Sequence, residues 1–332
     1  MSKRFLAAAC AAATALALSA CSSAPSSEGN ASKDGTLTVM ASFYPLQYLA
    51  EKIGGEHVTV TSLTPAGAEP HDLELSPKTV DALASADAVV YLAGFQAAVD
   101  EAIEQQAPTT VIDVSPAVEL VEANSSANHP SEDEDADEAQ SGESATEEHE
   151  GHDHEGHHHD MSTDPHFWLD PVRMASAATL VGDKLAEADP ANADTYKANA
   201  QALNEELSAL GDDLVAKTAT CQIKTFVTAH TAFGYLADRT GLTQVGISGL
   251  DPDSSPSPAR LAEISQIAKE QGVTTIFTEA LIDPKVAQTL ADDLGISTAV
   301  LDPIESQTDS SKDYAAVMKD NINALTTANN CQ

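Results

Sequence analysis

The sequence predicts an α/β fold of two lobes, each a parallel sheet flanked by helices, joined by one long linking helix. In each half of the chain, short apolar strands alternate with amphipathic helices, which is typical of parallel sheets covered on both faces. Between the halves, residues 191 to 219 form one helical stretch, roughly 40 Å long at 1.5 Å per residue. A chain of 332 residues is long enough to bury two cores.

The N-terminal lobe is expected over residues 37 to 190. Leu37 to Ala41 reads as its first strand, and residues 43 to 53 read as a helix because their apolar side chains recur at helical spacing. Ser76 and Pro77 predict another helix start, since Ser caps helices and Pro is tolerated in the first turn. The other elements expected are strands at 58 to 64, 88 to 92 and 110 to 113 and helices at 96 to 105 and 171 to 188.

The C-terminal lobe is expected over residues 220 to 332, where the alternation resumes after the linking helix. Strands are expected at 225 to 228, 243 to 247, 274 to 277 and 298 to 301. Helices are expected at 233 to 240, 258 to 271, 284 to 294 and 313 to 328. Two open α/β lobes bind ligands beyond the carboxyl ends of their strands, so a site is expected in the cleft between them.

An acidic, His-rich segment interrupts the first lobe. Residues 129 to 160 contain 13 acidic residues, 7 His and no Lys or Arg, so they cannot bury enough apolar surface to fold alone. We expect a disordered insert at about 122 to 163. Its His residues predict an auxiliary metal-binding loop, whereas the alternative is a solvated acidic spacer. They include His149, His152, His154, His157, His158 and His159.

The N-terminus has the parts of a lipoprotein signal. Residues 1 to 20 combine a basic start, an apolar core and small residues, and Leu18-Ser-Ala-Cys21 resembles the bacterial lipobox. We expect cleavage before Cys21, lipid attachment to its thiol and a flexible tether over residues 21 to 36. The alternative is an ordinary cleaved signal with an incidental Cys. No other apolar run is long enough to span a membrane.

Four cysteines occur, of which Cys10 lies in the signal and Cys21 in the lipobox. Because export permits disulfides, the remaining Cys221 and Cys331 are expected to pair, although two separate buried thiols are the alternative. The formal net charge of −36 argues against nucleic acid as a partner, since such binding needs Lys and Arg to neutralise phosphates. A cationic ligand is favoured instead.

Four potential metal ligands lie at or near strand ends, two in each lobe: His71, His166, His230 and Asp302. Three neutral imidazoles and one carboxylate suit tetrahedral Zn²⁺, and they disfavour Mn²⁺. Asp72, Asp170 and Glu279 are candidates to accept the other ring N–H of the ligands, or else cap helices. Trp168 and Phe233 are expected to form apolar walls.

The blocks Pro70-His71-Asp72 and Asp164-Pro-His166-Phe-Trp168-Leu-Asp170-Pro resemble the substrate-binding lipoproteins of metal-importing ABC transporters, the ZnuA-like or cluster A-I family. The resemblance covers about residues 36 to 332. It implies His71 and His166 as the first two ligands, a zinc-associated third His at His230, and Asp302 as the fourth. In some zinc members a Glu near the first His completes the shell, so Glu69 or water is the alternative there.

The resemblance implies an extracytoplasmic, non-enzymatic protein that captures Zn²⁺ as transported ligand and delivers it to a membrane permease. The chain has no phosphate-binding Gly-Lys-Ser/Thr loop, so a partner ATPase must supply the energy. We expect a monomer anchored to the cell membrane through Cys21. Alternatives are a manganese-binding member of the family, a zinc hydrolase, and an adhesin or metal buffer without transport.

Overall fold

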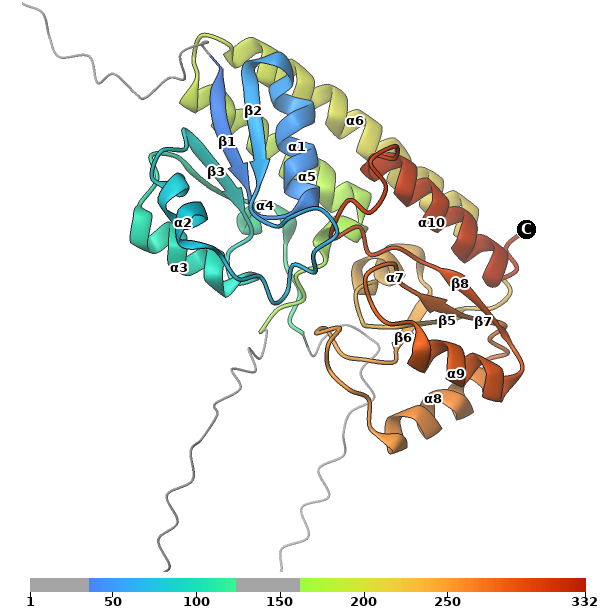
Figure 1. Cartoon of the computed structure of the whole chain (residues 1–332). Coiled ribbons are helices and arrows are strands. Elements are labelled where there is room, and N and C mark those ends of the chain that lie inside the picture. The colour runs from blue at the N-terminus through green and yellow to red at the C-terminus, as the bar shows by residue number, and fades with distance from the viewer. Residues whose placement is uncertain (1–35, 124–161) are drawn as a thin grey trace, which may run out of the picture.

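A computed structural model describes residues 36–123 and 162–332 of the chain (Figure 1). It contains two four-stranded parallel sheets of the same topology, with strand orders β2-β1-β3-β4 and β6-β5-β7-β8. Helices flank both sheets, and two long helices link the lobes. The predicted α/β fold class is therefore confirmed.

The first sheet comprises β1 (Leu37–Ala41), β2 (Val58–Ser62), β3 (Ala88–Tyr91) and β4 (Val111–Asp113). Alternate side chains of β1 pack on opposite faces of the sheet. Val39 and Ala41 belong to one hydrophobic cluster, and Met40 belongs to another on the other face. The helices of this lobe are α1 (Tyr44–Gly54), α2 (Pro77–Leu83), α3 (Ala97–Gln106) and α4 (Ser115–Val118), with short 3-10 turns at Gly55–His57 and Phe167–Leu169. As expected, the Ser76 hydroxyl caps α2 by accepting the N–H of Thr79.

The second sheet comprises β5 (Thr225–Thr228), β6 (Thr243–Gly246), β7 (Thr275–Thr278) and β8 (Ser297–Val300). The alternation recurs: Phe226 and Phe277 face the large common core, and Val227 and Ile276 face a smaller one. The helices of this lobe are α7 (Gly234–Thr240), α8 (Pro258–Glu270), α9 (Lys285–Leu294) and α10 (Tyr314–Ala328).

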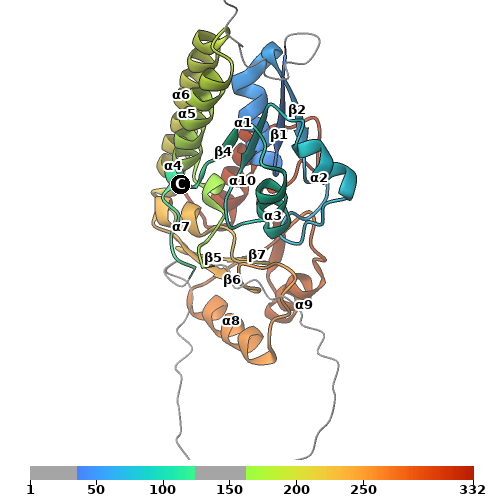
Figure 2. The same ribbon diagram turned by 90° about the vertical axis from the view of Figure 1, so that its left-hand side faces the viewer.

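The lobes are joined by α5 (Pro171–Ala188) and α6 (Ala193–Thr218), which run side by side (Figure 2). The close approach depends on Gly182, where a Cβ would lie 2.4 Å from the Cβ of Ala200. The long helix expected over 191 to 219 is thus present with slightly shorter ends, and it contacts α1 in one lobe and α10 in the other. One hydrophobic core continues from β1 to α10, so the lobes share a packed interior.

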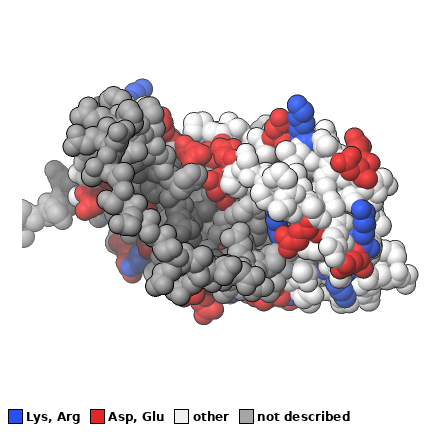
Figure 3. Space-filling model, turned by 90° about the horizontal axis from the view of Figure 1, so that it is seen from below, with Lys and Arg blue, Asp and Glu red and all other residues white. Residues whose placement is uncertain are grey.

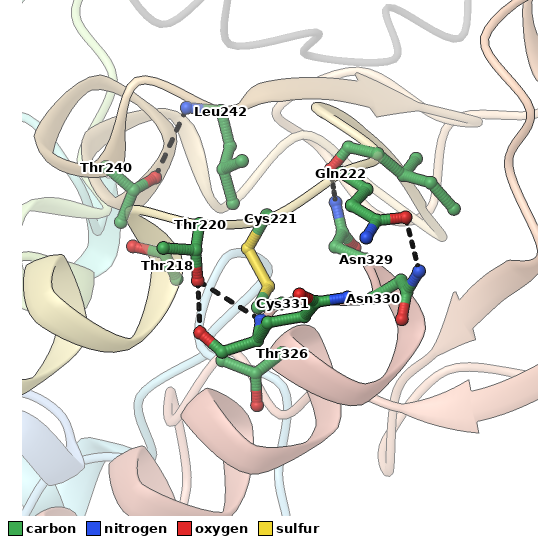
Figure 4. The surroundings of a disulfide bond; sticks show 12 residues. Thr218, Thr220, Cys221, Gln222, Thr240, Leu242, Thr326, Asn329, Asn330 and Cys331 are labelled. Carbon is green, nitrogen blue, oxygen red and sulfur yellow. Dashed lines mark hydrogen bonds between the residues drawn. A yellow bond between two sulfur atoms is a disulfide. The ribbon is translucent and has the colours of Figure 1, made fainter.

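A disulfide joins Cys221, just before β5, to Cys331, just after α10 (Figure 4). The expected pairing is therefore present. Beside it, the Asn330 side chain donates to the Gln222 side chain at 2.7 Å. The Ile223 N–H donates to the Asn329 carbonyl. The chain end is held against the start of the second lobe by covalent and hydrogen bonds together.

Several expectations lie outside the described residues: the signal peptide, lipidation at Cys21, most of the tether, and His149, His152, His154, His157, His158 and His159 of the insert. Within 36–123 and 162–332, no helix is long and apolar enough to cross a membrane. Seen from below, the described part of the surface carries Asp and Glu side chains interspersed with Lys and Arg (Figure 3).

Candidate metal centre

Three imidazoles and one carboxylate meet between the two sheets: His71, His166, His230 and Glu305. One ligand atom of each lies within 4.8 Å of all the others. A single oxygen, Oε1 of Glu305, lies 3.5 Å from Nε2 of His71, 3.2 Å from Nε2 of His166 and 3.4 Å from Nε2 of His230. The Nε2 atoms of His71 and His166 are 3.3 Å apart.

These four separations are close to those between neighbouring ligands of a tetrahedral zinc shell. With metal–ligand bonds of about 2.0–2.1 Å, neighbouring ligand atoms of a tetrahedron lie about 3.3 Å apart. Nε2 of His230 and Oε1 of Glu305 are also buried and make no hydrogen bond of acceptable geometry among the described residues. Buried polar atoms that converge without bonding one another fit a shared cation at their centre.

Both lobes contribute equally to this centre. His71 lies in the loop after β2, and His166 directly precedes the 3-10 turn that leads into α5. His230 follows β5, and Glu305 follows β8. Parallel strands end at the same edge of a sheet, so the loops beyond these ends from both lobes can reach one point.

Carboxylates orient two of the imidazoles from behind. Oδ1 of Asp164 lies 2.8 Å from Nδ1 of His166, and Oε2 of Glu279 lies 2.6 Å from Nδ1 of His230. The same carboxyl groups accept the backbone N–H groups of their own His partners. When each ring is neutral and its Nδ1 donates outward, the lone pair of its Nε2 faces the centre, which is the tautomer that a metal requires.

Of the carboxylates predicted to contact the ligand rings, Glu279 does so at His230. Asp164, which contacts His166, was not predicted, although it stands two residues before His166 in the same sequence block. Asp170 instead caps α5 by accepting the N–H of Val172 and pairs with the Arg239 guanidinium of the other lobe. Asp72 is exposed.

The fourth position is occupied by Glu305, where Asp302 had been expected. Oδ1 of Asp302 accepts the N–H of Ile304 at 2.8 Å, and its backbone N–H donates to Asn321 at 2.9 Å. Asp302 thus shapes the turn, in which Ile304 adopts φ +57°, and the turn carries Glu305 to the imidazoles. The sequence offered one indication of Glu305 as a ligand, namely that it is the next acidic residue after Asp302.

Glu69, the other alternative for that position, lies at the rim of the cluster. Its Oε1 is buried, has no hydrogen-bond partner among the described residues and is 4.0 Å from Nε2 of His71. Its Oε2 accepts the backbone N–H groups of His71 and Asp72. Burial, with the nearby charge of Glu305, raises the pKa of Glu69 to about 7.

The electrostatics of the cluster favour positive charge at its centre. Burial alone would lower the pKa of His230, but Glu279 and Glu305 outweigh it and raise that pKa to about 10. Burial opposes ionisation of Glu305, yet the surrounding imidazoles favour its carboxylate form and lower its pKa well below the usual value. Burial lowers the pKa of His71. Metal and proton therefore compete for the same atoms.

Aromatic rings enclose the centre. The Phe95 ring meets the His71 ring edge-on at 4.9 Å, and the Trp168 ring lies 5.2 Å from the His166 ring. Trp168 is fully buried and donates its indole N–H to the carbonyl of Pro303, two residues before Glu305. The apolar wall expected from Trp168 is present, and Phe233 is fully buried at the start of α7.

Comparison with known proteins gives a consistent result. The family model described as zinc-uptake complex component A, periplasmic (ZnuA), matches residues 39–328. The high-affinity zinc uptake system protein ZnuA of Bacillus subtilis is 34% identical over 318 residues, covering 93% of both chains. The zinc-binding protein AdcA of Streptococcus pyogenes is 34% identical over 88% of this chain, which spans only 56% of the length of that relative.

Solved structures resemble this fold. The laminin-binding protein Lmb of Streptococcus agalactiae, a bifunctional protein with adhesin and metal transporting activity, has a TM-score of 0.74 and 29% identity. That match covers 88% of this chain and 99% of the other. The Zn(II)-bound ZnuA-like domain of Streptococcus pneumoniae AdcA has a TM-score of 0.69 and 29% identity, covering 89% of this chain and 99% of the domain.

Proposed function

We propose, since the chain belongs to the ZnuA family of zinc-uptake binding proteins, that it captures Zn²⁺ between its lobes and delivers it to the permease of an ABC importer. The family is one of transport binding proteins and not of enzymes. The observation that carries the proposal is the convergence of three buried Nε2 atoms on one oxygen of Glu305 at tetrahedral separations.

We further propose His71, His166, His230 and Glu305 as the zinc ligands. Three imidazoles favour zinc over manganese, which prefers carboxylate and water. Four protein ligands also close the shell, whereas a hydrolytic zinc site keeps one position open for water. The donor set thus supports a zinc carrier over the manganese and hydrolase alternatives.

The proposed setting is the extracytoplasmic face of the membrane, with Cys21 as the lipid anchor and the protein acting as a monomer. The Cys221–Cys331 disulfide supports an oxidising compartment. The permease and a cytoplasmic ATPase are the proposed partners, consistent with the zinc uptake system named for the Bacillus subtilis relative.

The His-rich insert is proposed to collect zinc for this centre. The described chain stops at Ala123 and resumes at Ser162, and Glu122 pairs with Thr163 in an isolated bridge. Thr163 directly precedes Asp164, the residue whose carboxylate orients His166. The bridge therefore holds the two ends of the insert together, three residues before the proposed ligand His166.

Calorimetric titration of the mature protein with zinc tests this function. We expect one tight site, lost in His71→Ala, His166→Ala and His230→Ala, and retained in His57→Ala, a matched control whose ring packs near Tyr196 instead. Deleting residues 129 to 160 should remove only weaker binding. Wild-type protein without a tight zinc site would overturn the proposal, and loss of that site on deletion would overturn the ligand assignment.

A further inference from the structure

We propose that Gln96 and Gln244 are positioning residues for the metal centre, one in each lobe. Each side-chain amide makes two hydrogen bonds that fix the loop carrying a proposed ligand, His71 in one lobe and His230 in the other. The inference rests on the proposed zinc-binding function. It adds that two residues outside the ligand shell set the geometry of that shell.

In the N-terminal lobe, Gln96 stands just before α3 and is 2% exposed. Its Nε2 donates to the Thr64 hydroxyl at 3.0 Å and to the Pro70 carbonyl at 3.0 Å. The Thr64 hydroxyl in turn donates to the Ser42 carbonyl at 2.7 Å. Pro70 directly precedes His71, so this chain of bonds connects the ends of β1 and β2 to the ligand loop.

In the C-terminal lobe, Gln244 lies within β6 and is fully buried. Its Nε2 donates to the Thr228 hydroxyl at 2.8 Å and to the His230 carbonyl at 3.1 Å. The Thr228 hydroxyl donates to the same His230 carbonyl at 2.6 Å. The carbonyl of His230 is thus held by two donors, while Glu279 holds its ring and accepts its backbone N–H.

The two arrangements use the same chemistry on different elements, since Gln96 follows β3 and Gln244 lies inside an edge strand. A carbonyl can only accept, so each amide must turn its NH₂ group toward the ligand loop. The consequence is that Oε1 of both glutamines is buried without a partner among the described residues. A buried acceptor left unpaired costs stability, and an apolar side chain of similar length would serve the core better.

The two glutamines compensate for this cost by fixing the positions of the zinc ligands. A zinc site tolerates errors of only about 0.2 Å in its bond lengths, and loss of outer hydrogen-bond partners typically weakens metal affinity 10- to 100-fold. Without its amide bonds, the loop at Pro70 would lose a restraint next to His71. The backbone of His230 would keep only the Thr228 hydroxyl on its carbonyl.

The test uses Gln96→Met and Gln244→Met, which keep length and burial but cannot donate. Gln266→Met is the matched control, because Gln266 is exposed on α8 and its amide bonds Glu270 in its own helix. Zinc affinity is measured by competition with a chelator, ligand geometry by the visible absorption of the cobalt(II)-substituted protein, and stability by thermal unfolding of the metal-free protein. We expect zinc affinity about tenfold weaker and an altered cobalt spectrum in both variants, with an unchanged or higher unfolding temperature.

Two further variants keep the test decisive if a methionine variant does not fold. Thr64→Val and Thr228→Val preserve shape and remove the hydroxyl that each amide bonds, and changes in the same direction are expected. Unchanged zinc affinity and cobalt spectra would overturn the inference, as would affinity losses that follow lowered unfolding temperatures. If wild-type protein bound no zinc, the proposed function itself would fail, which is a distinguishable result.

Discussion

Oε2 of Glu279 lies 2.6 Å from Nδ1 of His230, and both side chains are almost completely enclosed. His230 follows β5 and Glu279 follows β7, and these strands are neighbours in one sheet, so the contact is set by the strand order of the C-terminal lobe. A carboxylate behind an imidazole makes Nε2 a stronger metal ligand and fixes the direction of its lone pair.

Glu279→Gln should therefore weaken zinc binding about tenfold without abolishing it, because the amide keeps the shape and one acceptor but loses the charge. Competition with a chelator measures the effect. Glu270→Gln, at the exposed end of α8, is the matched control and should have wild-type affinity. Equal affinities for the two variants would contradict a role for Glu279 in the centre.

Zinc binding should release protons at pH 7 to 8. The carboxylates raise the pKa of His230 to about 10, so below that pH the metal-free imidazole carries a proton that it must lose before it can ligate. Affinity should consequently increase as the pH rises and decrease as it falls. Calorimetric titration in two buffers of different ionisation enthalpy measures the protons released, and identical heats in both buffers would contradict the prediction.

Substitutions of Glu305 and Asp302 should show which of the two carboxylates is the fourth zinc ligand. Glu305→Gln should weaken zinc binding by about two orders of magnitude, since it removes the only carboxylate among the proposed ligands. Asp302→Asn should have a much smaller effect, because the side chain bonds the Ile304 N–H and an amide oxygen can accept the same bond. Titrations of both variants decide between them, and the reverse order of effects would restore Asp302 as the ligand.

Removing the disulfide should affect stability and leave the metal centre intact. The bond closes a loop of 110 residues, for which chain entropy gives a stabilisation of about 4–5 kcal/mol. Cys221→Ser combined with Cys331→Ser should therefore lower the thermal unfolding temperature markedly while zinc affinity stays within about twofold. A large loss of affinity in a folded variant would show that the chain end also positions the ligand loops.

The sequence by itself determined the features that depend on local pattern. Apolar periodicity gave the order of strands and helices, and Ser76 with Pro77 marked a helix start that the structure retains. His71 and His230 could be selected because they follow strands, and His166 because it precedes a helix, since loops of a parallel sheet converge at one edge. These inferences need only neighbouring residues and general rules of α/β architecture.

Tertiary structure alone decided which carboxylate joins the three imidazoles at the centre. Glu305 reaches them, instead of Asp302, because a turn shaped by the bonds of Asp302 to Ile304 and Asn321 points the later carboxylate inward. The restraints from Gln96 and Gln244 likewise join residues 14 to 32 positions apart. Such contacts depend on how two packed lobes orient their loops, and no periodicity in the chain encodes that orientation.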